Sequence, residues 1–367
     1  MAKETRKRKL DHIRISLSRN VQARKVTTGF EDVYFIHKAL PEIDKQEIDL
    51  STTVFNHRFA APLIVGAITG GTSEASKINA TIAEAVEELG LGMGVGSQRA
   101  AIEDKRLEKS FSTARKKAPT AFLIANIGGV QLTHGYGPKE AKKAIEMIEA
   151  DALTIHLNPL QEAVQPEGQT NFKGVLEKIG EIAKELDKPV IAKETGAGIS
   201  AEEAKKLEVV GVKGIDVSGA GGTSFAAVEY YRAKGKANSF QRRLGDVFWD
   251  WGIPTAVSVV EVSQAVNIPV IASGGLRDGV DMAKALALGA SLTSVSQPVL
   301  RTAVKGVKET RKVLSLLLEE LRNSMFLVGS DSVQALREKP LVITGKTAEW
   351  LRTRGLSIES YATRGKN

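Results

Sequence analysis

The sequence has no cysteine among its 367 residues. Disulfide bonds, thiolate-bound metals and iron–sulfur clusters are therefore excluded, as is any mechanism that needs a cysteine nucleophile or acid. Aromatic residues make up only 5% of the chain, which leaves few side chains on which nucleic-acid bases could stack. No run approaches the roughly 18 consecutive apolar residues of a membrane helix, and the N-terminus lacks the apolar segment of a secretory signal. We therefore expect a cytoplasmic protein with no membrane partner.

The net charge of +8 indicates anionic partners but does not distinguish a polymer from a small phosphate compound. With 42% hydrophobic and 26% charged residues, the chain can bury a large core, which excludes a disordered, collagenous or coiled-coil protein. Much of the positive excess lies near the N-terminus, at Lys3, Arg6, Lys7, Arg8, Lys9, Arg14, Arg19, Arg24 and Lys25. A basic arm that binds nucleic acid is one alternative, and a steep loss of polyanion binding with added salt would support it. We expect a small anionic ligand and no nucleic acid.

Short apolar segments recur between residues 62 and 296, separated by segments of helical periodicity, a pattern typical of βα units on a parallel sheet. The predicted strands are 63–68, 91–95, 121–125, 152–157, 190–193, 215–218, 270–273 and 292–296. In the intervening segment 74–89, Ile78, Ile82 and Val86 fall on one helix face. A doubly wound sheet alternates in the same way, but eight such units favour an α/β fold of the (β/α)8 or TIM-barrel type.

The predicted barrel leaves segments at both ends of the chain. Residues 1–61 precede the first strand and are expected to form an N-terminal extension that caps the barrel, which spans 62–325. Residues 307–325 predict a last long helix, and 326–367 a C-terminal helical tail without recognisable chemistry. At 219–246, a glycine-rich turn followed by a polar, basic stretch is too long for a simple loop, which predicts a lid-like insertion.

Polar residues follow nearly every predicted strand. Because the C-terminal strand ends of a barrel meet at one mouth, we expect the site there. These ends are Thr69-Gly70-Gly71, Gly96-Ser97-Gln98-Arg99, Asn126, His156-Leu157-Asn158 with Gln161-Glu162, Lys193-Glu194-Thr195-Gly196, Ser218-Gly219, Ser273-Gly274-Gly275 and Ser296-Gln297. A single serine or threonine here could simply face water, but the whole set indicates a ligand with many polar atoms.

Two glycine-rich segments predict a phosphate-binding site. Residues 273–279 follow the seventh strand, where glycines let backbone N–H groups approach an anion at the start of a helix. Residues 218–224 line the same mouth, and Thr223 offers a hydroxyl. Barrels often hold phosphate after strands seven and eight, which places Ser296-Gln297 on the other side of the anion. An ordinary turn and a flexible hinge are the alternatives for the two segments.

Charged residues at two other strand ends carry further expectations. Lys193 ends an apolar strand and must find an anion: it is a Schiff-base lysine, a cation beside the pyrimidine edge of a flavin, or a structural partner of Glu194. His156, Asn158, Gln161 and Glu162 lie close together, which places hydrogen-bond donors beside a carboxylate that suits a hard metal. One glutamate can bind Mg²⁺ only with waters and substrate phosphate as further ligands.

The ordered set of motifs resembles type 2 isopentenyl diphosphate isomerase over nearly the whole chain. It includes Arg8-Lys9-Leu10-Asp11-His12, Gln161-Glu162 after the fourth strand and the two glycine-rich segments. The resemblance implies an enzyme of isoprenoid biosynthesis that interconverts isopentenyl and dimethylallyl diphosphate with no net redox change. It also implies reduced FMN, NADPH or another reductant to reduce it, Mg²⁺, and a homo-oligomer, tetrameric or octameric.

By matching motif positions, the resemblance implies roles for individual residues. The FMN-binding residues would be Ala67, Ile68, Thr69, Ser97, Asn126, Lys193, Ser218, Thr223, Gly275, Leu276, Arg277, Ser296 and Gln297. The substrate would be surrounded by Arg8, Lys9, Ser97, Arg99, His156, Asn158 and Gln161, with Glu162 holding Mg²⁺ against its diphosphate. The catalytic group would comprise Gln161, Lys193 and His156, with the flavin itself as the acid and base. We expect Gln161, an amide, to position the substrate or relay a proton.

The chain departs from the family pattern at two places. Ile68 stands where members often have methionine, and Ser296-Gln297 where they often have Ala-Arg, which removes a possible cation near the FMN phosphate. Another FMN-dependent barrel oxidoreductase is the main alternative. Such an enzyme would need a base such as a His-Gly-x-Arg element near a late strand, and none occurs between Ser218 and Ser296.

Overall fold

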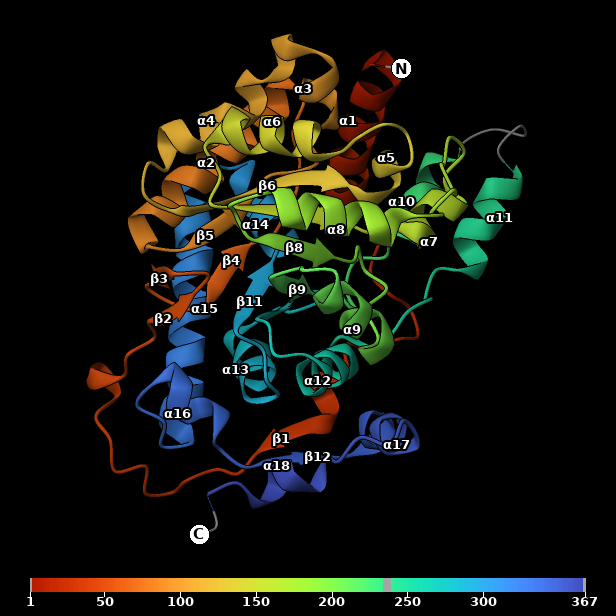
Figure 1. Ribbon diagram of the computed structural model, residues 1–367. Coiled ribbons are helices and arrows are strands. Elements are labelled where there is room, and N and C mark those ends of the chain that lie inside the picture. Colours follow the sequence, from red (N-terminus) through yellow and green to blue (C-terminus); the bar gives the residue numbers. More distant parts are fainter. Residues whose placement is uncertain (1, 234–238, 366–367) are drawn as a thin grey trace.

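The structure, a computed structural model, describes residues 2–233 and 239–365 (Figure 1). Its centre is a closed barrel of eight parallel strands in chain order, as the sequence predicts. The strands are β4 (Leu63–Val65), β5 (Gly92–Gly94), β6 (Phe122–Gly128), β7 (Ala152–His156), β8 (Val190–Lys193), β9 (Gly214–Asp216), β10 (Val270–Ala272) and β11 (Leu292–Val295). The strand β6 runs three residues beyond its predicted end, because Gly128 pairs with His156 of β7.

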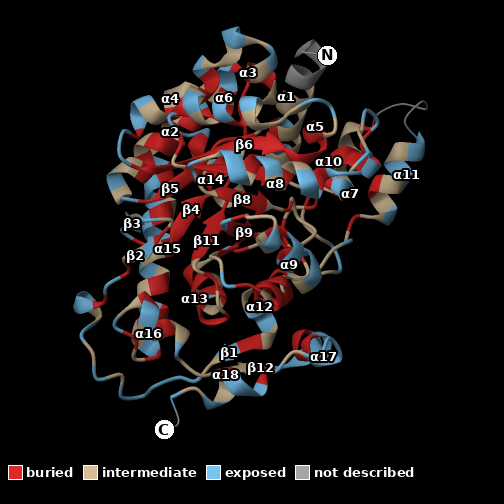
Figure 2. Cartoon of the chain, in the orientation of Figure 1, coloured by how far each residue is buried: buried red, intermediate tan, exposed pale blue. Residues whose placement is uncertain are grey.

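Helices surround the barrel, and most of them pack an apolar face against the strands or against a neighbouring helix. In α2 (Ser73–Leu89), Ile78, Ile82 and Val86 are buried, the Thr72 side chain caps the N-terminus, and Gly90 ends the helix in the left-handed conformation. Figure 2 shows the same division, with buried residues concentrated in the strands and on the inner sides of the helices. The other barrel helices are α3 (Arg99–Glu103), α4 (Lys109–Lys117), α5 (Gly129–Leu132), α6 (Pro138–Ile148), α7 (Pro159–Val164), α8 (Val175–Glu185), α9 (Ala201–Val209), α10 (Phe225–Arg232), α11 (Ser239–Val247), α12 (Thr255–Ala265), α13 (Gly279–Ala287), α14 (Gln297–Ala303) and α15 (Val307–Leu327).

The N-terminal end of the barrel is closed by aromatic side chains. The hairpin of β2 (Thr52–Val54) and β3 (His57–Phe59) carries Phe55 and Phe59 against Phe122, with ring centroids 5.9 and 5.2 Å from it. These rings fill the interior at that end, and two large cavities lined by described residues open at the C-terminal ends of the strands.

The N-terminal extension begins with α1 (Ala2–Ser18), which crosses the top of the molecule in Figure 1. It continues through short 3-10 turns η1 (Phe30–Asp32) and η2 (Lys45–Glu47) and the strand β1 (Val33–Phe35). The predicted lid region comprises α10, α11 and the glycine-rich turn before them, and its residues 234–238 lie outside the described residues.

The C-terminal tail, predicted to be helical, contains the helices α16 (Val333–Arg337), α17 (Gly345–Thr353) and α18 (Glu359–Thr363). It also contains the strand β12 (Leu341–Ile343), which pairs antiparallel with β1 at the bottom of Figure 1. Three apolar residues are too short a run to predict a strand, and β12 forms because β1 supplies its partner.

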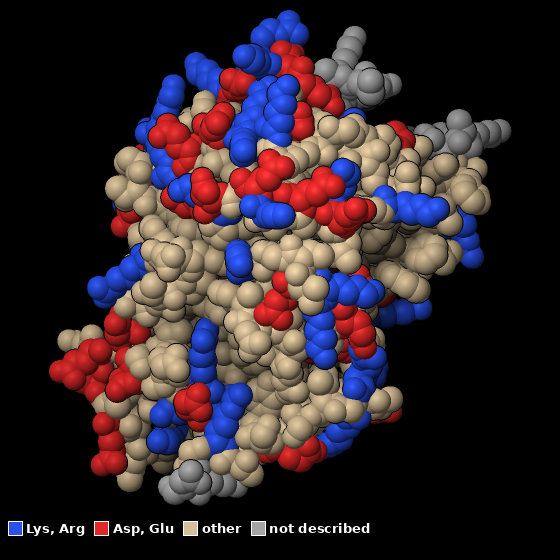
Figure 3. Space-filling view, viewed as in Figure 1, with Lys and Arg blue, Asp and Glu red and all other residues tan. Residues whose placement is uncertain are grey.

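The surface carries charges of both signs. On the face shown in Figure 3, Lys and Arg side chains intermix with Asp and Glu. Within residues 2–233 and 239–365, no helix is both long and apolar enough to cross a lipid bilayer.

Candidate active site

Two adjoining cavities open at the C-terminal ends of the barrel strands. We call the first, of about 1040 Å³, the glycine-loop cavity, because segments 218–223 and 273–277 line it. We call the second, of about 890 Å³, the basic cavity, because Arg8, Lys9 and Arg99 line it. Both are partly open to solvent. Residues that line both are His12, Ala67, Ile68, Lys193, Thr195 and Phe225, so the two cavities form one continuous site.

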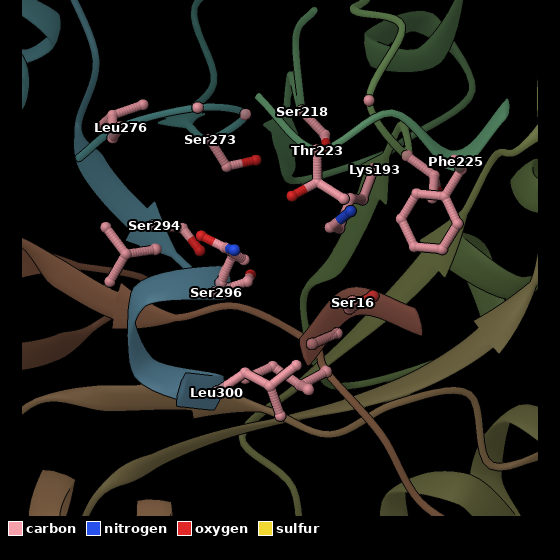
Figure 4. A pocket seen from close by; sticks show the side chains of 18 of the residues that line it. Ser16, Lys193, Ser218, Thr223, Phe225, Ser273, Leu276, Ser294, Ser296 and Leu300 are labelled. Atoms are coloured by element: carbon pink, nitrogen blue, oxygen red, sulfur yellow. The ribbon is translucent and has the colours of Figure 1, made fainter. Parts of the chain in front are cut away.

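The glycine-loop cavity is built where two glycine-rich loops touch. A Cβ on Gly222 would lie 2.5 Å from the Cα of Gly275, so only glycine permits this approach. Both Gly274 and Gly275 have positive φ, and Ser218 has φ 37° although it carries a side chain. Figure 4 shows Ser218, Thr223 and Ser273 around the cavity opposite Ser294 and Ser296. Hydroxyl groups and loop backbone therefore surround this space.

The hydroxyl of Thr223 is buried and has no hydrogen-bond partner among the described residues. A buried hydroxyl without a partner costs free energy, which a bound acceptor would recover. Its position between the glycine loops therefore fits the phosphate of a cofactor such as FMN.

The expected anion site at the start of a helix is not what the structure shows at α13. The Asp278 side chain already caps this helix by accepting from Asp281 N–H, and Gly279 N–H donates to Glu320 at 2.8 Å. An anion near Gly275 would therefore meet loop backbone and Arg277 rather than a free helix terminus.

Gln297 also contributes a cation indirectly. Its side-chain amide oxygen points towards Arg301 and accepts hydrogen bonds from Nε and Nη2 of that residue, both at 2.9 Å. A guanidinium thus stands one helical turn from the position where the family resemblance implied a lost cation. Burial lowers the pKa of the Arg277 guanidinium, and the nearby charge of Arg301 lowers it further.

Lys193 lies between the two cavities. Strand register places it beside His156 of β7 and Asp216 of β9. Its Nζ donates to the backbone carbonyl of Glu194 at 2.5 Å, whereas the Glu194 carboxylate accepts from the backbone N–H groups of Thr195 and Ala197. Of the three alternatives for Lys193, the structural pairing with Glu194 thus involves the backbone carbonyl and not the carboxylate. Burial raises the pKa of Asp216 and raises that of Glu194 to about 7.

The basic cavity is closed from above by α1. Lys9 Nζ donates to the carbonyl of Ser97 at 2.6 Å and lies 5.1 Å from the centroid of the Phe111 ring. Burial, reinforced by the charge of Arg8, lowers the pKa of Lys9 to about 7. Arg99 is held by Glu103 at 2.8 Å. The N-terminal basic motif is thus part of this cavity rather than a solvated tail.

The Glu162 carboxylate lies in a shell of amide groups. It accepts from Asn158 Nδ2 at 3.1 Å, from Gln165 Nε2 at 2.5 Å and from Gln169 N–H at 2.8 Å. The amide oxygens of Asn158 and Gln165 are buried and unpartnered among the described residues. Within that part of the chain there is no cluster of three histidine, aspartate or glutamate side chains that could hold a metal alone. These oxygen donors fit Mg²⁺ that takes its other ligands from water and a phosphate.

His156 is neutral and its orientation is fixed. Burial, together with the charge of Lys193, lowers its pKa to about 3. Asn126 Nδ2 donates to the carbonyl of Val95, so its Oδ1 faces His156 Nδ1 as an acceptor at 2.8 Å. The ring proton therefore sits on Nδ1, which leaves Nε2 as an acceptor. The prediction of a donor at His156 is corrected: its donor is already used by Asn126.

Sequence reasoning did not single out a buried carboxylate beside Gln161. Glu229 accepts from His12 Nε2 at 2.9 Å and from Gln161 Nε2 at 3.3 Å, and pairs with Arg232. Burial raises its pKa, but His12 and Arg232 outweigh this, and the net pKa of Glu229 is lowered. Glu229 lies 217 positions from His12, so no local motif could have linked them.

Every residue that the sequence assigned to the site lines one cavity or the other. Ser218, Thr223, Gly275, Leu276, Arg277, Ser296 and Gln297 line the glycine-loop cavity. Arg8, Lys9, Thr69, Ser97, Arg99, Asn126, His156, Asn158, Gln161 and Glu162 line the basic cavity. The sequence did not single out Ile13, Phe225 and Leu300, which form the apolar wall of the glycine-loop cavity together with Ile68, nor Ser16, which adds a hydroxyl to its lining.

Comparisons with known proteins agree with this geometry. The sequence profile of the family described as FMN-dependent dehydrogenase matches residues 138–343. An isopentenyl-diphosphate delta-isomerase of Methanosarcina barkeri is 49% identical over 365 residues, covering 100% of this chain and 99% of that protein. One of Pyrococcus furiosus is 53% identical over 355 residues, covering 95% and 89%.

Solved structures show the same fold at low sequence identity. Mandelate oxidase with (S)-2-phenylpropionate has a TM-score of 0.62 at 20% identity, covering 93% of this chain and 98% of that one. Mandelate oxidase with benzoyl-formic acid has a TM-score of 0.62 at 19% identity, covering 92% and 94%. At these identities the likeness concerns the fold alone.

Proposed function

The chain belongs to the isopentenyl-diphosphate delta-isomerases, and from this premise we propose how its two cavities serve that reaction. The enzyme is an isomerase of isoprenoid biosynthesis in an FMN-dependent family, and it interconverts isopentenyl and dimethylallyl diphosphate. The reaction adds a proton at one end of the double bond and removes one from the allylic carbon attached to its other end. The protein must therefore bind a diphosphate firmly and hold an apolar alkene near a proton donor and acceptor.

The proposed FMN site is the glycine-loop cavity with the adjoining strand ends. The phosphate would be held by the loop backbone at Gly275, the Thr223 hydroxyl and the guanidinium of Arg277, with Arg301 nearby. Ala67, Ile68, Thr69, Ser97 and Asn126 would contact the ring system. When bound in its reduced form, the flavin would supply the acid and base for the carbon atoms.

Lys193 would act on the reduced flavin as a charge partner. Its cation is held at the end of β8 by the Glu194 carbonyl, between the two cavities. A positive charge there stabilises an anionic ring. The hydrogen bond to this carbonyl fixes the position of Nζ.

The proposed substrate site is the basic cavity. Arg8, Lys9 and Arg99 would bind the diphosphate, and Glu162 would hold Mg²⁺ against it, with Asn158 orienting the carboxylate. Because His156 offers only an acceptor at Nε2, it would receive a hydrogen bond from substrate or water. Gln161 is hydrogen bonded to both Asn158 and Glu229, which fits a positioning or relay role.

The observation that carries this proposal is the continuity of the two cavities across Lys193, Ile68 and Phe225. A flavin in one cavity would face an alkene whose diphosphate lies in the other. The test is an omission series: isopentenyl diphosphate is incubated with protein, FMN, NADPH and Mg²⁺, and dimethylallyl diphosphate is measured by NMR. We expect product only in the complete mixture. Equal product without FMN or without Mg²⁺ would refute the assigned roles.

The alternative is an FMN-dependent oxidoreductase, favoured by the match to the dehydrogenase profile. It would consume a hydroxy acid and an acceptor in equal amounts, whereas the isomerase needs reductant only to keep its flavin reduced. NADPH as the reductant and the tetrameric or octameric assembly remain predictions of the sequence resemblance, and the cytoplasmic location remains a prediction from the sequence composition.

A further inference from the structure

We propose that the C-terminal tail is a clasp that positions the N-terminal segment 21–28 over the FMN phosphate site. We call segment 21–28 the strap, and β12 with α17 the clasp. None of the described residues of the clasp lines either cavity. The clasp nevertheless binds β1, which follows the strap in the chain, on one side and the barrel on the other. The proposal rests on the FMN site assigned above.

The strap interlocks with the first glycine loop. Ala23 N–H donates to the carbonyl of Gly222 at 2.8 Å, and Ser224 N–H donates to the carbonyl of Val21 at 2.8 Å. Gln22 pairs with Thr223 in an isolated antiparallel bridge. This bridge fixes the backbone of Thr223, whose hydroxyl has no partner among the described residues. The strap therefore acts as an added strand along this loop.

The strap also touches the second loop and its arginine. A Cβ on Gly275 would come within 2.4 Å of Thr28 Cγ2, and one on Gly221 within 2.2 Å of Thr28 N. The Gln22 side chain accepts from Arg277 Nη2 at 2.5 Å. Moving the strap would therefore shift both the backbone of the glycine loops and the guanidinium proposed to meet the phosphate.

The clasp grips the chain where the strap ends. Thr347 Oγ1 donates to the carbonyl of Gly29 at 3.2 Å, and Thr347 N–H donates to the Asp32 carboxylate at 2.9 Å. Thr344 N–H donates to the Asp32 carbonyl at 2.9 Å, and β12 pairs with β1 directly after it. The contact is close-packed, because a Cβ on Gly29 would lie 2.7 Å from Thr347 Oγ1.

The clasp itself is anchored on α12. Trp350 Nε1 and Arg354 Nε each donate to the buried Glu261 carboxylate at 3.1 Å. The N-terminal end of the same helix binds the strap, since Ala256 N–H donates to the Thr28 carbonyl at 2.8 Å. One barrel helix thus holds both the end of the strap and the clasp, which gives the tail a rigid base from which to position the strap.

The test combines Thr347→Val, which removes a hydroxyl at nearly constant volume, with Asp32→Ala. Affinities of wild type and variants for FMN and for riboflavin, which lacks the phosphate, are measured by quenching of flavin fluorescence. Loss of two hydrogen bonds predicts an FMN Kd about tenfold higher in the double variant, with riboflavin binding changed less than about twofold. Hydrogen exchange of the strap amides in the protein without FMN should accelerate.

The matched control is Tyr361→Phe, which removes a bond from the same tail to the carbonyl of Leu288, away from the strap. We expect wild-type FMN affinity in this variant. Thr347→Val alone serves where the double variant does not fold, with an intermediate effect expected.

Three outcomes in the Thr347 and Asp32 variants would overturn the clasp: faster strap exchange with unchanged FMN affinity, unchanged strap exchange, or equal weakening of FMN and riboflavin. Equal weakening in Tyr361→Phe would also overturn it, because the tail would then matter only for general stability. A wild-type protein that binds no FMN would refute the proposed function itself, so the two failures are distinguishable.

Discussion

Single carboxylates and cations determine the chemistry of the basic cavity. Among the described residues, Glu162 is the one acidic side chain that lines it, and three amide donors hold its carboxylate in place. Its role can therefore be separated from that of the cofactor site, which lies on other strand ends.

The variant Glu162→Gln keeps the size of the side chain but removes the charge that would bind Mg²⁺. We expect isomerisation at ordinary Mg²⁺ to fall about 100-fold or more, with partial recovery at high Mg²⁺ and unchanged FMN content. Steady-state rates over a Mg²⁺ series and the flavin absorbance of the purified protein measure both. Glu177→Gln, an exposed change at the start of α8, is the control. Loss of flavin in Glu162→Gln would show that the map of the site is wrong.

Lys9 predicts a pH dependence of substrate binding. Its pKa of about 7 means that it carries its charge below that pH and loses it above. If the charged form binds the diphosphate, KM should rise roughly tenfold between pH 6 and pH 8. In Lys9→Arg the guanidinium stays charged, so KM should lose most of that dependence, which also controls for titration of the substrate itself. Identical pH profiles in the two proteins would remove Lys9 from the diphosphate site.

Among the elements, the two glycine loops depend most on close backbone contact. Gly275→Ala would add a Cβ within 2.4 Å of Thr28, at a φ of 88°. We expect a loss of about 1–3 kcal/mol in unfolding free energy, together with weaker FMN binding. Thermal unfolding and flavin titration measure these effects.

Gly135→Ala is the matched control, since its φ is 92° but no atom lies within 4 Å of the added Cβ. It carries the backbone strain without the contact. If Gly135→Ala weakened FMN binding as much as Gly275→Ala does, the contact between loop and strap would have no special role.

The elements also show how far the sequence can be interpreted. The eight barrel strands were predictable because each is a short apolar run that is buried on both faces, and 190–193 matches β8 residue for residue. The site residues at the strand ends were predictable for the same reason, since the barrel brings those ends together. The strand β12 was not, because its three residues take their structure from β1.

Side chains of the site that come from outside the strand ends were harder to predict. Phe225 and Ser16 lie on α10 and α1, and only the packing of these helices over the mouth brings them to the cavity. The pairing of His12 with Glu229 depends on the same packing. The donor of His156 was misjudged because its partner, Asn126, lies on the neighbouring strand.

At the scale of the whole molecule, the two termini meet the barrel at different levels. The N-terminal helix lines both cavities through His12, whereas the C-terminal tail lies beyond α12 and α13 at the bottom of Figure 1. The strap connects α1 to the region held by the C-terminal tail. Residues from the first dozen positions of the chain can therefore reach the site at the mouth of the barrel. FMN should therefore stabilise the protein as a whole, and at 100 times its Kd it should add about 2.7 kcal/mol to the free energy of unfolding.

The central claim is that one continuous site uses its flavin without consuming reducing equivalents. The most direct measurement reduces the FMN-loaded protein once with dithionite, without oxygen, and counts molecules of dimethylallyl diphosphate formed per flavin by NMR. We expect many turnovers per flavin, with the flavin still reduced at the end. At most one turnover per flavin, or no product while a hydroxy acid such as mandelate re-reduces the oxidised flavin, would contradict this claim.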